Sequence, residues 1–425
     1  MNFLDTRLMM SYGKSIKQCR WRKLLTVKTP DEASQIICER FPLRAMKTEK
    51  IGINDVCGRV LHDDVVAAEY VPGFDRSTVD GYAVVASDTF GCSAGIPAML
   101  NLSGEILMGE SADDDLKTGT CVAVSTGGDL PNGADAVVML EDTEEYGDGL
   151  IGITAPAAPG KNIIFKGDDV SPGDRILTGG TILAPHDIGI LSALGVDSVN
   201  VRKGPLVGVI STGDELVETT VVPKRGQIRD VNTPLLIAAA RQFGAAAKSY
   251  GMIRDDENAL QNTLARAVED CDIVLISGGS SAGMRDLTSR VIESAGITLF
   301  HGIAMKPGKP TILGDIGGKP VFGLPGHPVA AYFVTELFVR PLIDSLMGAK
   351  NKRRTVTART GEAISANHGR AEYIAVILEN DDTIARPIRG KSGLIASLAR
   401  SDGYISIPRD LEGLPKSAEV TVTLW

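Results

Sequence analysis

The segment "DIVLISGGSSAGMRD" (residues 272–286) joins an apolar run, a loop of small residues and a closing acid, Asp286. The apolar run is typical of a buried strand. A loop with almost no side chains usually lets another group approach its backbone closely. Its amides, lying before a helix, form a cradle for an anion, and the positive end of the helix assists it. The segment therefore predicts a binding loop for a phosphate or similar oxyanion, with the amides of Gly278, Gly279, Ser280, Ser281 and Gly283.

Strands and helices alternate around this segment from residue 204 to residue 348. "LVGVI" (206–210) is typical of a buried strand, and Leu260, Leu264 and Val268 recur every fourth residue on one helix face. This alternation predicts a doubly wound, largely parallel sheet whose ligands bind beyond the carboxyl ends of the strands. The other expected elements are helices at 235–244, 256–270, 287–296 and 328–346, and strands near 246–253, 272–277, 298–305 and 320–323.

Three further loops of unusual composition lie in the same region. "STGDEL" (211–216) follows the first strand, and "KPGKP" (306–310) and "GLPGHP" (323–328) come later. Lys306 and Lys309, held by prolines, supply two fixed cations for an anion. In these loops no Gly-Lys-Ser/Thr follows the glycines, and the glycines do not have the Gly-x-Gly-x-x-Gly spacing, so the loops are neither a Walker P-loop nor a dinucleotide fingerprint. We expect the loops to cluster at one edge of the sheet.

Several acids also follow the expected strands. Carboxylates beside an anion repel it unless a divalent cation lies between them, so the pattern indicates Mg²⁺, a catalytic proton acceptor, or both. Asp256 opens a helix and is expected to be its cap, and Asp214 is expected to have a turn role. The functional candidates, also as metal ligands, are Glu215, Asp255 and Asp286.

The flanking regions have a different pattern. Residues 349–425 contain short alternating runs separated by Gly, Asn and Asp, which predicts a small antiparallel sheet or barrel. Residues 71–165 are rich in Gly, Pro and short β-type runs. Residues 166–203 combine turns with one helix after Pro185. The expected fold is therefore a multidomain α/β and β protein with mixed and β-rich N-terminal domains.

The bulk composition limits the function classes. A chain of 425 residues predicts about three domains. Its formal charge of −9 argues against a general nucleic-acid binder. The six cysteines include no Cys-x-x-Cys pair, which disfavours a zinc site or a disulfide framework and favours the cytoplasm. No apolar run reaches membrane-spanning length, and residues 1–22 are expected to be an extension, with Met9 or Met10 as alternative starts.

Four motifs of the α/β region resemble the MoeA proteins and the carboxyl-terminal domain of gephyrin, a family of molybdenum-insertion enzymes. They are "STGDEL", "DIVLISGGSSAGMRD", "MKPGKP" and "GLPGHPVA", in this order and spacing. Upstream, "VPGFDRSTVDGYAV" (71–84) and "VSTGGDLPNGADAVVMLE" (124–141) are similar to further family motifs. The resemblance covers essentially everything after residue 23. It departs from the family pattern at Thr78, Val79 and His327, and what these departures change stays open.

The resemblance implies a cytoplasmic homodimer of four-domain subunits, with a MogA-like α/β domain and a C-terminal β-barrel. The implied reaction is hydrolysis of adenylylated molybdopterin with Mg²⁺ and insertion of molybdate or tungstate into the dithiolene, which yields molybdenum cofactor and AMP. The molybdopterin adenylyltransferase and apo-molybdoenzymes are the implied partners. The expected segments are 1–22, a linker domain of 23–70 with 166–203, a β-rich domain of 71–165, an α/β domain of 204–348 and a barrel of 349–425.

Site residues carried over from the family motifs fall into two groups. Asp286 is expected to hold Mg²⁺ or orient water at the phosphoanhydride, with Glu215 and Asp255 in support. Asp80 and Thr126 are expected to complete the cleft from the second subunit. Arg370 and Ser397 lie in shared motifs, with a structural role favoured. The catalytic set is Asp80, Thr126, Glu215, Asp255 and Asp286, and the binding set adds Lys306, Lys309, Gly323, Pro325 and Gly326 to the amides of the 278–283 loop.

Three other functions are compatible with the same patterns. The chain could be an adenylyltransferase acting on molybdopterin, a dimeric scaffold for peptide partners, or a hydrolase of damaged nucleotides. ATP consumption without molybdate would favour the first, and AMP release without an oxyanion would favour the third. The sequence does not separate molybdate from tungstate, because both are tetrahedral dianions of nearly equal size.

Overall fold

The computed structural model describes residues 27–42, 47–278, 282–351, 353–388 and 390–425, and no side chains for 282–286. The chain forms two compact units, one of residues 1–48 with 202–425 and one of residues 49–201. This division cuts the expected linker segment 23–70 at residue 48. The five-segment boundaries given above therefore stay a prediction.

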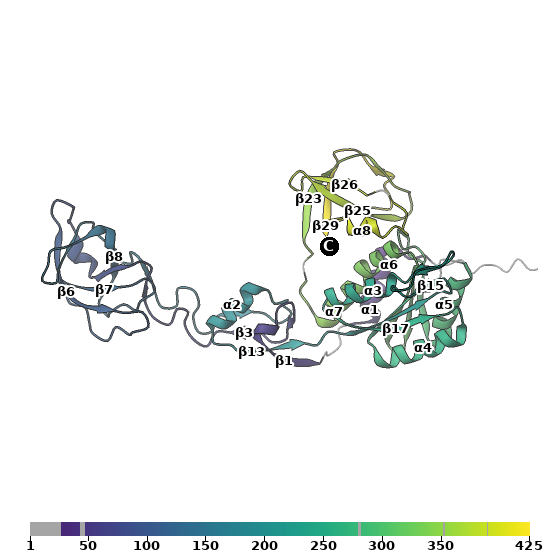
Figure 1. Cartoon of the computed structure of the whole chain (residues 1–425), viewed down its shortest axis with the longest axis horizontal. Coiled ribbons are helices and arrows are strands. Elements are labelled where there is room, and N and C mark those ends of the chain that lie inside the picture. Colours follow the sequence, from purple (N-terminus) through teal and green to yellow (C-terminus); the bar gives the residue numbers. More distant parts are fainter. Residues whose placement is uncertain (1–26, 43–46, 279–281, 352, 389) are drawn as a thin grey trace, which may run out of the picture. The chain divides into compact units, whose positions relative to one another are not determined.

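The first unit contains a six-stranded mixed sheet with its helices (Figure 1). Four neighbouring strands are parallel, as expected. The strand beside them, β21 (Ile312–Ile316), runs in the opposite direction, and the edge strand β19 (Ile297–His301) pairs antiparallel with β21. The strand at 312–316 was not expected; it forms a hairpin with the next strand through Gly317 and Gly318, whose positive φ angles suit a tight two-residue turn. In spatial order the strands are β17 (Ala246–Ile253), β14 (Leu206–Thr212), β18 (Ile273–Gly278), β22 (Lys319–Leu324), β21 (Ile312–Ile316) and β19 (Ile297–His301).

The helices of this unit follow the apolar periodicity of the sequence. In α4 (Glu257–Asp270) the buried face includes Leu260 and Leu264, and the carboxylate of Asp256 accepts a hydrogen bond from the amide of Ala259 at 2.6 Å. The cap role expected for Asp256 is therefore confirmed. The other helices are α1 (Pro30–Arg40), α3 (Asn232–Gln242), α5 (Ala282–Ala295), α6 (Pro328–Val334) and α7 (Arg340–Met347), with the π-helix η4 (Thr335–Val339) between the last two.

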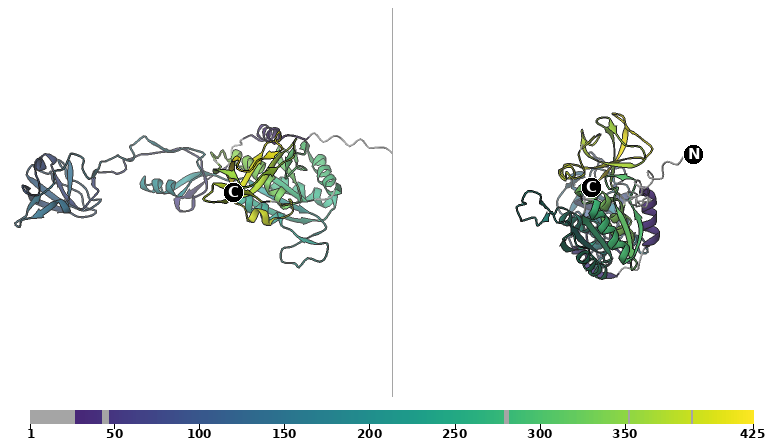
Figure 2. Two further views of the ribbon diagram at one scale, coloured as in Figure 1. Left: turned by 90° about the horizontal axis from the view of Figure 1, so that it is seen from above. Right: turned by 90° about the vertical axis from the view of Figure 1, so that its right-hand side faces the viewer.

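Helix α1 belongs to this unit although it precedes the sheet by more than 160 residues in the chain. It contacts α7, and Figure 2 shows it, in purple, on the outside of the α/β part. Arg40, at its end, forms an ion pair with the buried carboxylate of Asp315. The helix begins with a capping box of Thr29 and Glu32.

The C-terminal region is a closed five-stranded barrel, as predicted. Each strand pairs with the next, and the last pairs again with the first. Its interior contains Val376, Ile405 and Val422. In closing order the strands are β25 (Ala371–Glu379), β26 (Ile384–Pro387), β23 (Thr355–Thr360), β29 (Glu419–Leu424) and β27 (Gly403–Ile407). The short strand β20 (Met305–Lys306), from the α/β region, pairs in parallel with β25.

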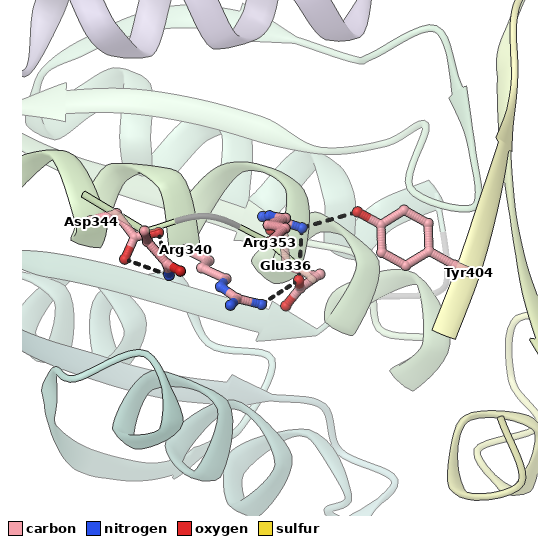
Figure 3. A network of polar contacts seen from close by, with 6 residues as sticks. Glu336, Arg340, Asp344, Arg353 and Tyr404 are labelled. Atoms are coloured by element: carbon pink, nitrogen blue, oxygen red, sulfur yellow. Dashed lines mark hydrogen bonds and ion pairs between the residues drawn. The ribbon is translucent and has the colours of Figure 1, made fainter. Parts of the chain in front are cut away.

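An aromatic cluster and a polar network join the barrel to α6 and η4. Phe333 contacts the ring of Tyr404 edge-on at a centroid distance of 5.5 Å, and Trp425 packs against both. Beside them the guanidinium of Arg353 donates to the Glu336 carboxylate at 2.7 Å and to the Tyr404 hydroxyl at 3.0 Å (Figure 3). The barrel is thus fastened to the α/β part by buried side chains.

The second unit contains a six-stranded sheet with an apolar cluster on each face, because successive strand residues point to opposite faces. Tyr82 and Val84 belong to one cluster and Ala83 to the other. In spatial order its strands are β8 (Ala136–Met139), β5 (Gly81–Val84), β7 (Thr120–Val124), β6 (Ala98–Ile106), β10 (Leu150–Ile153) and β9 (Thr143–Glu145).

The remainder of the second unit is a small mixed region. Helix α2 (Pro185–Ala193) contributes Leu191 to an apolar cluster with Leu61 and Val201. The helix after Pro185 is thus present as expected. The short strands here are β1 (Thr48–Gly52), β2 (Val60–Leu61), β3 (Val65–Val66), β12 (Arg175–Leu177) and β13 (Ser198–Arg202).

Candidate functional site

The ends of β14 and β18 form the point where the chain direction across the sheet reverses. From β14 the chain continues to β17 on one side, and then crosses to β18 on the other. Crevices at such points are the usual ligand sites of open α/β sheets. A Cβ on Gly278 would lie 2.3 Å from the carbonyl oxygen of Thr212, so only glycine fits there. The adjoining Gly279, Ser280 and Ser281 lie outside the described residues, and Gly283 lies in α5.

Two of the expected catalytic acids meet at this edge. The carboxylate of Asp255 lies 3.4 Å from the Thr212 hydroxyl, which donates to it, and the Asp255 amide donates to Asp214 at 3.3 Å. Burial and the charges of Asp214 and Glu215 raise the pKa of Asp255. The carboxylate of Glu215 lies over the turn that precedes it. A Cβ placed on Gly213 would lie only 2.7 Å from this carboxylate. The structure thus brings Glu215 and Asp255 into one acidic group.

The expected third acid, Asp286, lies in the first turns of α5, among the residues whose side chains are not described. Among the described residues, no three His, Cys, Asp or Glu side chains are arranged to hold a metal ion. The acidic group therefore concentrates negative charge. The described residues alone do not form a complete metal site there.

Asn232, at the start of α3, links this edge to the 323–328 loop. Its side-chain amide donates to the Ser277 hydroxyl at 2.7 Å and to the Gly326 carbonyl at 2.9 Å. Asn232 is buried, and its side-chain oxygen has no hydrogen-bond partner among the described residues. The sequence did not predict this role for Asn232, since an asparagine at a helix start usually signals only a cap.

A cavity of about 740 Å³ lies between loops of the α/β part and the barrel. Four cationic side chains line it, from three separate segments of the chain, and Glu372 is its one lining carboxylate among the described residues. The lining includes the expected Lys306, Lys309 and Pro325, together with Arg370, Lys391, His327, Ser392 and Ser397. A cavity of this size with an excess of positive charge can hold an anionic small molecule.

The two expected lysines differ in their surroundings. The Lys306 ammonium lies 3.0 Å from the carboxylate of Glu372, whereas Lys309 is exposed and forms no ion pair with any described carboxylate. Burial alone would raise the pKa of Glu372, but hydrogen bonds from Lys306 and Asn367 outweigh it, and the net pKa is lowered. Glu372 is therefore a charged group beside the cavity.

The residues expected to bind a ligand in the 323–328 segment lie in three different environments. Gly323 lies inside β22, where a Cβ would meet Thr288 and Ile312, which is a packing constraint rather than a route to a ligand. Pro325 lines the cavity, while the Gly326 carbonyl accepts the bond from Asn232. His327 bonds through Nδ1 to the Ser392 hydroxyl at 2.7 Å. The departure from the family pattern at His327 thus faces the cavity.

Arg370 and Ser397 also line the cavity, although sequence reasoning favoured a structural role for both. Glu372 and Lys391 were missed altogether. The available signal was the "GRAEY" stretch (369–373), in which a cation and an acid stand two residues apart at the start of a strand. Both residues of this pair, Arg370 and Glu372, line the cavity.

Asp80 and Thr126 meet in the second unit. The Asp80 carboxylate accepts from the Thr126 amide at 2.7 Å and from its hydroxyl at 3.0 Å. The backbone hydrogen bond from Thr126 is the main cause that lowers the pKa of Asp80. The two residues expected to act together are therefore hydrogen-bonded, and the Asp80 side chain joins two loops rather than only closing its own Asp-Gly turn.

Three family profiles together match most of the chain. The profile of the MoeA N-terminal region (domain I and II) matches residues 28–195. The one described as "Probable molybdopterin binding domain" matches residues 208–345, and that of the MoeA C-terminal region (domain IV) matches residues 357–425. The second profile contains the six-stranded mixed sheet except the first two residues of β14, and the third contains all five barrel strands except the first two residues of β23.

Curated relatives resemble the chain over nearly its full length. A protein of Mycobacterium tuberculosis named molybdopterin molybdenumtransferase 2 is 32% identical over 405 residues, which are 93% of this chain and 99% of that protein. The molybdopterin molybdenumtransferase of Bacillus subtilis is 31% identical over 412 residues, 94% and 95% of the two chains.

A solved structure agrees in fold as well as in sequence. The crystal structure of a molybdopterin biosynthesis MoeA protein from Pyrococcus horikoshii OT3 is 36% identical and superposes with a TM-score of 0.84, covering 94% of this chain and 100% of that one. None of the helices in the described part of the chain is both long and apolar enough to span a bilayer.

Proposed function

The chain belongs to the MoeA family, and from this membership we propose that it is a molybdopterin molybdenumtransferase of molybdenum cofactor biosynthesis. Its substrates are adenylylated molybdopterin and molybdate or tungstate. Water cleaves the phosphoanhydride to release AMP, and the oxyanion supplies the metal that the dithiolene sulfurs bind. The products are AMP and molybdenum cofactor.

The observation that carries this proposal is the cationic cavity. Lys306, Lys309, Arg370 and Lys391 approach one space from different elements, which suits a small multiply charged anion better than a flat surface of lysines would. Backbone amides beside these cations can add hydrogen bonds to oxyanion oxygens. We assign this cavity to the tetrahedral oxyanion.

The acidic edge beside β14 and β18 is assigned to the phosphoanhydride. The pKa of Asp255 is raised first by partial burial and then by the charges of Asp214 and Glu215, and a divalent cation would offset the repulsion among these acids. Mg²⁺ prefers oxygen ligands and is commonly held by one or two carboxylates together with waters and substrate phosphates, so the residues present fit it. Asp286, Glu215 and Asp255 would hold the ion, which supplies charge neutralisation when bound. As the alternative to metal binding, we assign Asp255, whose pKa is raised, to accept a proton from the attacking water.

The subunit arrangement is proposed from the family resemblance. We propose a homodimer in which Asp80 and Thr126 of one subunit complete the cleft of the other. We further propose the five segments given in the sequence analysis as domains, a cytoplasmic location, and contacts with the molybdopterin adenylyltransferase and apo-molybdoenzymes. The hydrogen bond between Asp80 and Thr126 supports their acting as one unit.

The test is AMP release from adenylylated molybdopterin with and without molybdate. The proposal expects release that depends on the oxyanion, and Asp286→Asn is expected to bind the pterin nucleotide but lose release. Loss on the order of 10²-fold or more is expected for a group acting on the reacting water. AMP release that does not depend on the oxyanion would instead indicate a nucleotide hydrolase. Consumption of ATP in a parallel assay with molybdopterin would indicate an adenylyltransferase. Absence of turnover in both assays would indicate a scaffold.

A further inference from the structure

Lys306, one of the four cations of the cavity, is already paired with a negative charge. Strand β20 pairs in parallel with β25, and this register places Lys306 directly opposite Glu372. The ammonium lies 3.0 Å from the Glu372 carboxylate. About half of the Lys306 side chain is exposed, whereas only 4% of the Glu372 side chain is. The acid is therefore the fixed partner and the lysine the one that can face a ligand.

Glu372 is held in place from both sides of its carboxylate. One oxygen accepts the bond from Lys306, and the other accepts from the amide of Asn367 at 2.9 Å and from its side chain at 2.8 Å. These bonds lower the pKa of the acid, so it stays charged at neutral pH. A buried carboxylate with three donors cannot swing away when an anion enters.

We infer that Glu372 is a positioning residue that limits the affinity of the cavity for its oxyanion, by holding Lys306 in place and cancelling part of its charge. This inference rests on the proposed function, in which the cavity binds a tetrahedral oxyanion. Lys309, Arg370 and Lys391 then attract the anion, while the Glu372–Lys306 pair keeps it from binding so tightly that it cannot leave.

The direction of the effect follows from Coulomb's law. An anion that contacts Lys306 must approach the negative charge 3.0 Å behind it, and like charges repel most where water is excluded. Gln has nearly the same shape as Glu but lacks the charge. Its single oxygen can still accept the two bonds from Asn367, while its amide nitrogen, a donor, replaces the oxygen that accepts from Lys306. Removing the charge should therefore strengthen oxyanion binding, whereas a purely structural role predicts weaker binding on substitution.

The experiment measures tungstate and molybdate binding to the full chain by titration calorimetry. Glu372→Gln is expected to bind each oxyanion about tenfold more tightly than the wild type, with a slower release rate. The matched control is Glu379→Gln, on the same strand and also ion-paired, but with its pair exposed. The control is expected to bind as the wild type does. Unchanged or weaker binding by Glu372→Gln, with wild-type binding intact, would overturn the inference.

A second comparison removes the lysine first. Lys306→Gln leaves the Glu372 charge uncompensated beside the anion, so the double variant Lys306→Gln/Glu372→Gln should bind the oxyanion about tenfold more tightly than Lys306→Gln alone. Equal affinities of these two variants would contradict the inference while leaving the proposed function in place. Absence of oxyanion binding by the wild type would instead overturn the assignment of the cavity itself, and the inference with it.

Discussion

Two carboxylates of the first unit have pKa values shifted in opposite directions, and the reasons are local. Asp255 lies among other acids and its pKa is raised, first by burial and then by Asp214 and Glu215. Glu372 is much more deeply buried, but three hydrogen-bond donors surround it, and its pKa is lowered. A group whose charge is disfavoured suits proton transfer, whereas one whose charge is favoured suits a fixed electrostatic role.

Asp255→Asn is expected to separate activity from stability. Because the pKa of Asp255 is raised in the folded state, its ionisation disfavours folding, and this penalty is absent below its ordinary value of 3.8. At neutral pH the variant should therefore be at least as stable as the wild type. Its advantage should disappear as the pH falls through the raised pKa towards 3.8.

Urea denaturation at several pH values would measure that difference, and AMP release would report an activity loss on the order of 10²-fold. Asp256→Asn is a suitable comparison, because asparagine also caps helices and should leave both properties nearly unchanged. A stability loss for Asp255→Asn that grows with pH would disprove the electrostatic account.

At the scale of elements, the junction between the barrel and the helices α6, η4 and α7 contains a buried charge. Glu336, in η4, is 1% exposed and accepts bonds from Arg340 and Arg353, while one of its oxygens has no partner among the described residues. Burial raises its pKa, and the two arginines act against that shift. The residues of this network come from η4, α7, the segment before β23 and β27 (Figure 3).

Arg353→Leu is expected to destabilise the chain by about 1–3 kcal/mol, since it leaves Glu336 with a single cationic partner and removes a donor to Tyr404. Tyr404→Phe should cost about 1 kcal/mol or less, because it removes one hydrogen bond. Chemical denaturation measures both. Arg386→Leu, which breaks an exposed ion pair on the barrel, serves as the control and should change stability by less than about 1 kcal/mol. Equal effects for Arg353 and Arg386 would argue against a role for the buried network.

At the scale of the whole molecule, the proposal divides one site between two subunits. Asp80 and Thr126 lie in the second compact unit, and Asp255 and the cationic cavity lie in the first. If each cleft takes Asp80 from one subunit and Asp255 from the other, a mixed dimer of two inactive variants contains one intact cleft.

Co-expression of differently tagged Asp80→Asn and Asp255→Asn subunits tests this arrangement. The purified mixed dimer is expected to recover molybdate-dependent AMP release, whereas each variant alone should have almost none. Tandem affinity purification isolates the mixed species, and size-exclusion chromatography confirms its mass. A mixed dimer as inactive as its parents would place both residues in the same subunit's site.

The sequence by itself determined the elements whose signals are local. The four-residue spacing of Leu260 and Leu264, with Asp256 as cap, was sufficient for α4. Apolar runs ending in small-residue loops predicted β14 and β18, and the alternating runs after residue 349 predicted the barrel strands. The loops and acids of the carboxyl edge were predictable because parallel strands bring their carboxyl ends to one edge.

Only the tertiary structure decided which residues share the cavity and what each one contacts there. Lys306 and Glu372 are 66 residues apart, and no local pattern relates them; they meet because β20 joins a barrel strand in a particular register. The bonds of Asn232 to Ser277 and Gly326 likewise span long stretches of chain. Side-chain periodicity reports which face of an element is buried, but pairing between distant elements depends on packing of the complete core, which no single segment encodes.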